Sequence, residues 1–233
     1  MRTIPVIAWV GFALAPGFGG AAAAGRGDGA FTDTVAVDKN DFGPTGVNRY
    51  FVLVPGPELV LEGQEDGRKT VLTILVRDER KVIDGVTTRV IEGRETAAGQ
   101  LVEVSRNYFA ISRRTGDVFY FGEELDIYKE VGIASHEGAW LSGVGGARFG
   151  LMMPGAPRVG LRYPQEVAPG VATDRTEMVS LTARRATPAG KFARCLQTAE
   201  SSPLERGKSS NFYAENVGLM VDGELKLVRP AAS

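Results

Sequence analysis

The feature that most constrains this chain is that its apolar residues never repeat with a helical period. No window of ten or more residues places them every 3.6 positions. Short β-branched and aromatic runs alternate with turn residues instead, most clearly in Lys81–Ile83, Asp84-Gly85 and Val86–Ile91. An Asp-Gly pair between two apolar runs is a strong hairpin signal. The sequence therefore predicts an all-β protein.

About ten to twelve such runs follow one another along the chain, separated by turn residues. Successive strands with short connections favour an antiparallel meander, and a large meander curls or closes because free sheet edges are costly. We therefore expect a single strongly curved antiparallel meander sheet or barrel, lipocalin-like in general shape. Residues 142–160 are rich in Gly and Pro, so we expect a loop crossing one end of the sheet there.

The N-terminus has the three parts of a secretory signal peptide. Met1–Thr3 is cationic, Ile4–Phe18 is apolar, and Ala21–Ala24 offers small residues for cleavage. The apolar run is short and interrupted by Gly and Pro, which disfavours the alternative of a retained membrane anchor. We expect a signal peptide at 1–24, a flexible leader at 25–47 and a single β domain at 48–230. We expect an exported protein, periplasmic or extracellular, without stable membrane insertion after signal removal.

The charge balance and the cysteine count exclude further classes. The chain holds 27 Lys and Arg against 28 Asp and Glu, for a net charge of −1, so no basic face for nucleic acid is expected. Cys195 is the only cysteine, which rules out an intrachain disulfide. Its apolar, strand-like setting predicts a buried thiol. The oligomeric state stays open.

The aromatic side chains gather between residues 107 and 166. An apolar cavity lined by aromatics with a few polar groups is the usual form of a small-molecule site, although core packing explains the same residues. If a cavity exists, we expect the aromatics to supply contact area and the carboxylates to orient a polar end or a cation. The expected ligand-binding residues are Tyr108, Tyr120, Trp140, Tyr163, Glu137 and Glu166.

Acid–base chemistry is an alternative use of the same stretch. Candidate catalytic residues are Glu123, Glu137, Glu166 and His136, because carboxylates and histidine are the usual proton carriers. His136 is the only histidine, and no Asp-rich calcium loop is present, so no metal site and no cofactor are expected. The Gly-rich run at 142–146 matches neither a phosphate-binding loop nor a dinucleotide fingerprint.

Several short motifs resemble a group of uncharacterised exported bacterial β-proteins. They are Tyr120–Glu123, Glu137–Trp140, Met153-Pro154, Tyr163–Glu166 and Phe212–Gly218. The group's opening motif N-x-Y-F-x-L-x-P-G is matched by Asn48, Tyr50, Phe51, Leu53, Pro55 and Gly56. The resemblance covers most of residues 48–228 and implies a secreted β-domain but no reaction. A Glu-His pair common in the group before the segment Phe212-Tyr213 is replaced here by Ser209-Ser210.

Three hypotheses follow. The first is an exported β-domain that binds an apolar or amphipathic small molecule in a curved-sheet cavity. The second is an enzyme that uses carboxylate and histidine acid–base chemistry in the same cavity. The third is an envelope scaffold or interaction domain without a pocket. The shape of the interior separates them, because only the first two need an open cavity.

Overall fold

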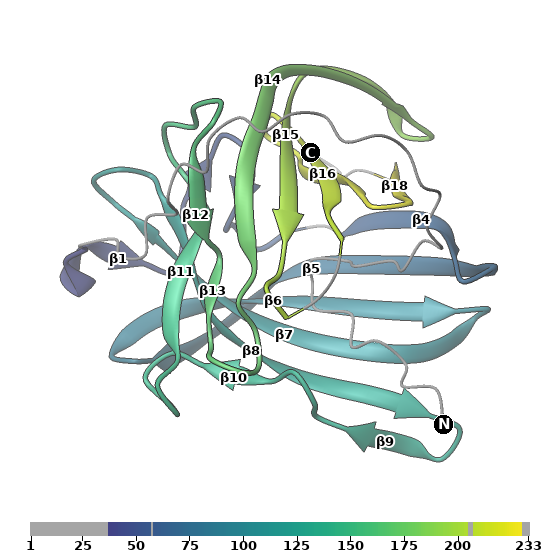
Figure 1. Cartoon of the computed structure of the whole chain (residues 1–233), viewed down its shortest axis with the longest axis horizontal. Coiled ribbons are helices and arrows are strands. Elements are labelled where there is room, and N and C mark those ends of the chain that lie inside the picture. The colour runs from purple at the N-terminus through teal and green to yellow at the C-terminus, as the bar shows by residue number, and fades with distance from the viewer. Residues whose placement is uncertain (1–36, 57, 205–206, 230–233) are drawn as a thin grey trace.

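The computed structural model describes residues 37–56, 58–204 and 207–229. It is an all-β fold built around one antiparallel meander that nearly closes into a barrel (Figure 1). This confirms the predicted fold class. The hydrogen-bonded path through the barrel runs β12-β14-β15-β16-β17-β18-β4-β5-β6-β7-β8-β11-β13. In the described part of the chain, no helix is long and apolar enough to cross a membrane.

Five consecutive strands joined by tight turns form one wall. They are β4 (Leu59–Glu65), β5 (Arg68–Ile83), β6 (Val86–Ala97), β7 (Gln100–Ser112) and β8 (Val118–Lys129). The first three turns are Asp66-Gly67, Asp84-Gly85 and Ala98-Gly99, and both residues of each have positive φ. Two such residues define the mirror-image turn whose twist matches paired strands. The Asp-Gly hairpin predicted from the sequence is therefore confirmed.

The second wall crosses the first steeply in Figure 1. Its strands are β14 (Arg175–Thr187), β15 (Gly190–Ser201), β16 (Ser209–Ala214), β17 (Gly218–Asp222) and β18 (Leu225–Arg229). β18 returns to the first wall by pairing with β4, with Leu227 opposite Leu61. Both of these leucines are fully buried.

Closure of the barrel depends on one short segment. β12 (Arg162–Pro164) pairs with β14, and β13 (Glu166–Val167) pairs with β11 (Arg148–Met153). Only Gln165 separates β12 from β13, so the chain changes partner within a few residues and joins the two ends of the sheet. We call residues 162–167 the seam. Only three residue pairs join the seam to β14, and only two join it to β11.

Short elements complete the fold. They are η1 (Lys39–Asp41), β1 (Phe42–Gly43), β2 (Val47–Asn48), β3 (Phe51–Val52), β9 (Gly132–Ser135) and β10 (Trp140–Leu141). β1 pairs with β7, β9 and β10 pair with β8, and β2 pairs with β3.

Two stretches differ from the sequence-based expectation. The stretch 142–160, expected to be a loop, contains β11, because the apolar run Arg148–Met153 lies between Gly- and Pro-rich flanks that concealed it. The described part of the expected leader, residues 37–47, instead packs on the sheet, where β1 pairs with β7 and Phe42 is buried. The expected signal peptide lies outside the described residues.

Two aromatic groups organise the core. In one, Phe42 contacts Phe119 at a ring-centroid distance of 5.1 Å, and Phe121 stacks on Phe149 at 4.7 Å. The other is a row of rings in which Phe109 contacts Phe51 at 5.0 Å, Tyr120 stacks on Phe109 at 4.7 Å and Trp140 meets Tyr120 edge-on at 5.4 Å. These distances are in the favourable range for aromatic pairs. Much of the aromatic set seen in the sequence is therefore core.

Candidate functional site

One end of the barrel contains an apolar cavity of about 220 Å³. It lies between the segment that follows β2, the strands β4 to β6, and the hairpin formed by β16 and β17. Its lining includes Phe51, Leu59, Ile74, Ile91, Tyr213 and Leu219. We call it the apolar cavity.

Strand register explains why this end is apolar. Leu59 lies opposite Ile74, Val76 lies opposite Ile91, and Tyr213 lies opposite Leu219. Directly opposite residues on paired strands point to the same face of a sheet. The strand pairs β4–β5, β5–β6 and β16–β17 therefore present apolar side chains to the same space.

Towards the other end of the same strands, the side chains become acidic. On β6 and β7, Glu95 lies opposite Glu103, and Asn107 on β7 lies opposite Glu123 on β8. On the second wall, Thr176 lies opposite Glu200, and Asn211 lies opposite Asp222. All of these side chains are at most 9% exposed. With Glu166 of the seam and the nearby Asp174, the seven carboxyl groups form what we call the carboxyl cluster.

Besides the effect of burial, carboxyl groups on one wall raise the pKa values of carboxyl groups on the other wall across the barrel interior. The charges of Glu65 and Asp222 raise the pKa of Glu95, and that of Asp174 raises the pKa of Glu123. The pKa of Glu166 is raised first by burial and then by the charges of Asp174, Glu123 and Glu200. The seam residue Glu166 therefore faces carboxyl groups from several strands.

Burial is the main cause of the raised pKa values in the carboxyl cluster. It raises the pKa of Glu95 to about 7, of Glu123 and Glu200 to about 8, and of Glu103 to about 9. Burial disfavours the ionised form because water no longer solvates the charge. At neutral pH most of these groups consequently hold their protons.

Tyr120 and Trp140 connect the aromatic core to the carboxyl cluster. The Tyr120 hydroxyl donates a hydrogen bond to Asn107 Oδ1, and Glu123 lies close enough to raise the pKa of Tyr120. Trp140 lies directly opposite Glu123 across β10 and β8, and its ring contacts that of Tyr120. The Trp140 indole N–H is buried without a hydrogen-bond acceptor among the described residues.

The structure brings together some of the sequence-predicted site residues. Tyr120, Trp140, Glu123 and Glu166 meet at the carboxyl cluster. Tyr163 is buried near them, with its pKa raised by burial and then by the charge of Glu200. None of these residues lines the apolar cavity.

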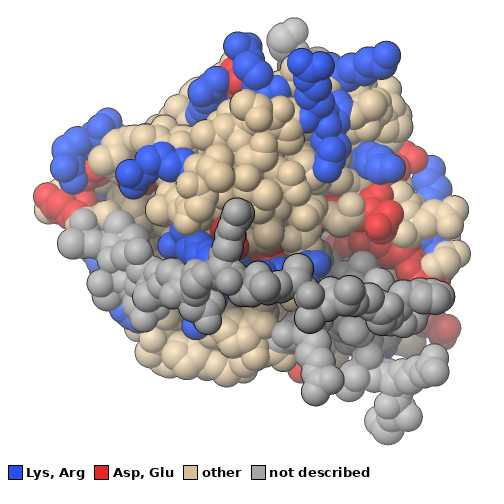
Figure 2. All heavy atoms as spheres, turned by 45° about the horizontal axis from the view of Figure 1, so that its top comes forward, with Lys and Arg blue, Asp and Glu red and all other residues tan. Residues whose placement is uncertain are grey.

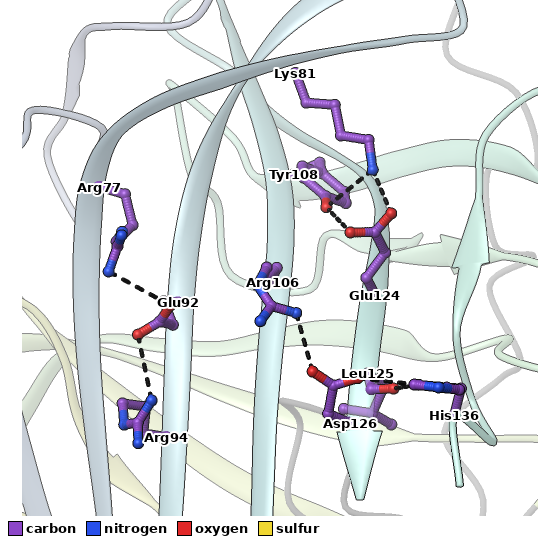
Figure 3. Close-up of polar contacts among 10 residues, drawn as sticks. All are labelled: Arg77, Lys81, Glu92, Arg94, Arg106, Tyr108, Glu124, Leu125, Asp126 and His136. Atoms are coloured by element: carbon purple, nitrogen blue, oxygen red, sulfur yellow. Dashed lines mark hydrogen bonds and ion pairs between the residues drawn. The ribbon is translucent and has the colours of Figure 1, made fainter. Parts of the chain in front are cut away.

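Tyr108 lies elsewhere, in a network that includes Lys81 and Glu124 (Figure 3). Its hydroxyl donates to Glu124 Oε2 over 2.6 Å. Burial and this hydrogen bond raise the pKa of Tyr108, while the hydrogen bonds from Lys81 and Tyr108 lower that of Glu124. Tyr108 therefore belongs to an ion-pair network and not to the interior sites.

His136 and Glu137 are both exposed. His136 Nδ1 lies 2.8 Å from the carbonyl oxygen of Leu125 and 3.0 Å from Asp126 Oδ1. Arg106 holds the other oxygen of Asp126 at 3.1 Å (Figure 3). This arrangement fixes the His136 ring outside the barrel, so the four catalytic candidates do not form one group.

Sequence reasoning missed Glu95, Glu103, Glu200 and Asp222. The sequence pattern that could have pointed to them is a polar residue at every second position, as in Glu103, Ser105 and Asn107 on β7. That pattern was ambiguous because an alternating strand normally points its polar side chains to solvent. Here Glu103, Ser105 and Asn107 of β7 are buried instead.

Within the described residues, no group of three or more His, Cys, Asp or Glu side chains is arranged to hold a metal ion. Comparisons of the chain with protein-family models, with curated proteins and with solved structures found no match. The resemblance to an exported bacterial group thus stays a prediction.

Proposed function

We propose that this is an exported β-domain that binds a small apolar molecule in the apolar cavity. The cavity itself is the observation that carries the proposal. Its lining is aliphatic and aromatic, and it sits at one end of the barrel. Ligand sites in barrels commonly occupy the mouth and combine apolar walls with few polar groups.

The size of the cavity limits the ligand. An engineered apolar cavity of about 150 Å³ stays dry and binds benzene. A volume of about 220 Å³ is roughly half as large again, so it suits one bicyclic ring or a short alkyl chain. Tyr213 and Asn216 are among the few lining residues with polar groups, so they are the candidates to orient a hydroxyl or a ring nitrogen. Export remains an expectation from the N-terminal sequence.

Indole is a suitable probe, because it is bicyclic and carries one N–H donor. We expect it to bind the purified protein in calorimetry and to raise the melting temperature. Leu59→Trp should fill the cavity, since Leu59 is a partly buried lining residue, and should weaken indole binding at least tenfold.

Leu161→Trp is the matched control. Leu161 is also a partly buried leucine packed against the core, but it does not line the cavity. We expect this variant to bind indole like the unmodified protein. If neither indole, toluene nor hexanol binds the unmodified protein, or if both tryptophan variants bind indole equally, the proposal is wrong.

The enzyme hypothesis has a narrower basis than the sequence suggested. It now rests on Glu123 and Glu166, since the charge of Glu123 adds to burial and to the charge of Asp174 in raising the pKa of Glu166, while Glu137 and His136 lie outside. A carboxyl pair of this kind could act as general acid and base. Neither Glu123 nor Glu166 lines the apolar cavity. Binding in that cavity is therefore the better supported function.

A further inference from the structure

The carboxyl cluster has a surplus of hydrogen-bond acceptors. Four buried carboxyl oxygens lack a donor among the described residues: both oxygens of Glu166, Oε2 of Glu123 and Oε2 of Glu200. Each of these glutamates is at most 2% exposed. Buried polar atoms in folded proteins are nearly always hydrogen-bonded, so such atoms indicate a partner that the chain itself does not provide.

The charges that surround these oxygens are of one sign. Besides burial, the charges of Asp174, Glu123 and Glu200 raise the pKa of Glu166. Besides burial, the charges of Glu95 and Glu123 raise the pKa of Glu103. Arg68 lowers the pKa of Glu95 at the outer edge of the cluster. The inner glutamates can therefore be neutralised by protons or by a bound cation.

The aromatic side chains around the cluster narrow the choice of cation. Tyr120, Tyr163 and Tyr213 are each influenced by at least one of its carboxyl groups, and Trp140 contacts Tyr120. Organic ammonium groups favour sites that combine aromatic faces with carboxylates. A bare metal ion needs several oxygens that converge on one point, and in the described residues no such arrangement exists.

We propose that the carboxyl cluster binds an organic ammonium ion, with Glu166, Glu123 and Glu200 accepting its N–H donors. A primary ammonium group brings three N–H donors and one positive charge, so it can satisfy three of the four bare oxygens and offset one negative charge. The glutamates of this site do not line the apolar cavity, and Tyr213 alone borders both.

We expect the ligand to approach the cluster from the acidic end of the barrel. Glu95, Asp222 and Glu103 are 5%, 5% and 9% exposed, and Glu65 is partly buried beside them. Acidic side chains gather at the right-hand side of the surface in Figure 2, the side on which the turns after β4 and β6 lie in Figure 1. These outer carboxyl groups would attract a cation and pass it to the inner ones.

Putrescine is the probe, measured by calorimetry at pH 7.0 and 8.5 and constant ionic strength. We expect one binding site, tighter binding at pH 8.5 and release of protons, seen as a heat that depends on the ionisation enthalpy of the buffer. The reason is that the cation replaces protons held by Glu123 and Glu200, whose pKa values are about 8. The other titratable groups of the cluster are Glu95, Glu103, Glu166, Asp174 and Asp222, with Glu65 and Arg68 at its edge.

Glu166→Gln and Glu200→Gln should each weaken putrescine binding about thirtyfold or more, the lower bound for loss of one partner from a buried charge pair. Both variants keep side-chain size and mimic the protonated acid, so they are expected to fold, which circular dichroism checks. Glu137→Gln is the control, because Glu137 is an exposed carboxylate. Its affinity should not change.

Three results would overturn the proposal. They are no putrescine binding at pH 8.5, equal binding by Glu166→Gln and the unmodified protein, or calcium chloride that binds at micromolar concentration and displaces putrescine. Indole binding separates this proposal from the function above. Leu59→Trp should lose indole and keep putrescine, and Glu166→Gln should do the reverse.

Discussion

Replacing Gly150 by alanine is expected to lower the free energy of unfolding by about 3 kcal/mol, the upper end for overpacked sites. Gly150 is on β11, beside the seam. A Cβ at this position would lie 2.3 Å from the carbonyl oxygen of Gln165 and 2.7 Å from that of Pro164. Both are backbone atoms of the seam and cannot rotate away. Urea unfolding at pH 6 measures the change, and the melting temperature should fall by roughly 6–12 °C.

Gly56→Ala is the matched control. Its added Cβ would meet only one atom within 4 Å, the Val54 carbonyl oxygen at 3.7 Å, which is an ordinary contact. We expect a change below about 1 kcal/mol. Equal stability of Gly150→Ala and the unmodified protein would mean that the seam does not pack against β11 as described.

Raising the pH from 6 to 9 is expected to destabilise the protein strongly. An unfolded glutamate releases its proton near pH 4.5, whereas Glu95, Glu123, Glu200 and Glu103 keep theirs up to pH values of about 7, 8, 8 and 9. Their contribution to stability is therefore complete below about pH 4.5 and is lost as the pH rises through their folded pKa values. Above pH 6, Glu95 alone contributes a loss of roughly 1 kcal/mol, because about one pH unit remains before its folded pKa of about 7.

The other three glutamates act in the same direction, so the losses of stability add across the carboxyl cluster. We consequently expect urea unfolding to show a loss of stability that is steepest between about pH 5 and 7 and levels off by about pH 9. Glu103→Gln and Glu200→Gln should each reduce its slope. Glu137→Gln should leave the slope unchanged. A stability that is constant or increases over this range would contradict the assignment of these glutamates to the interior.

Much of the fold could be predicted from local sequence. The Asp84-Gly85 hairpin depends on two residues with positive φ, which the chain itself specifies. The seam could not be predicted in this way, because Arg162–Pro164 and Glu166–Val167 have partners at opposite ends of the sheet. Pairing over such distances leaves no periodic signal in a short segment. β11 was missed for a similar reason, since its apolar run is only six residues long.

The candidate site was predictable only in part. Trp140 and Tyr120 stood out because large aromatics are rarely left exposed, and Glu166 was included because it follows Tyr163 in the same motif. Glu137 was chosen for its closeness to His136 and Trp140 in sequence, but the turn before β10 leaves it on the surface. Glu200 and Asp222 are on strands formed late in the chain and meet Glu123 and Glu95 only when the barrel closes. Their role is a property of the tertiary fold.

The ammonium site and the pH dependence both require a barrel interior that contains uncompensated carboxyl groups. Carbon-13 NMR of the glutamate side-chain carboxyls tests most directly whether such groups are present. Assignments can be made with single Glu→Gln variants at positions 103, 123, 166 and 200, with Glu137→Gln as the surface reference. We expect the interior resonances to titrate above pH 7 and to shift to lower pH when putrescine is added. Titration of all four near pH 4.5 would show that water reaches these groups and would contradict the carboxyl cluster as a buried site.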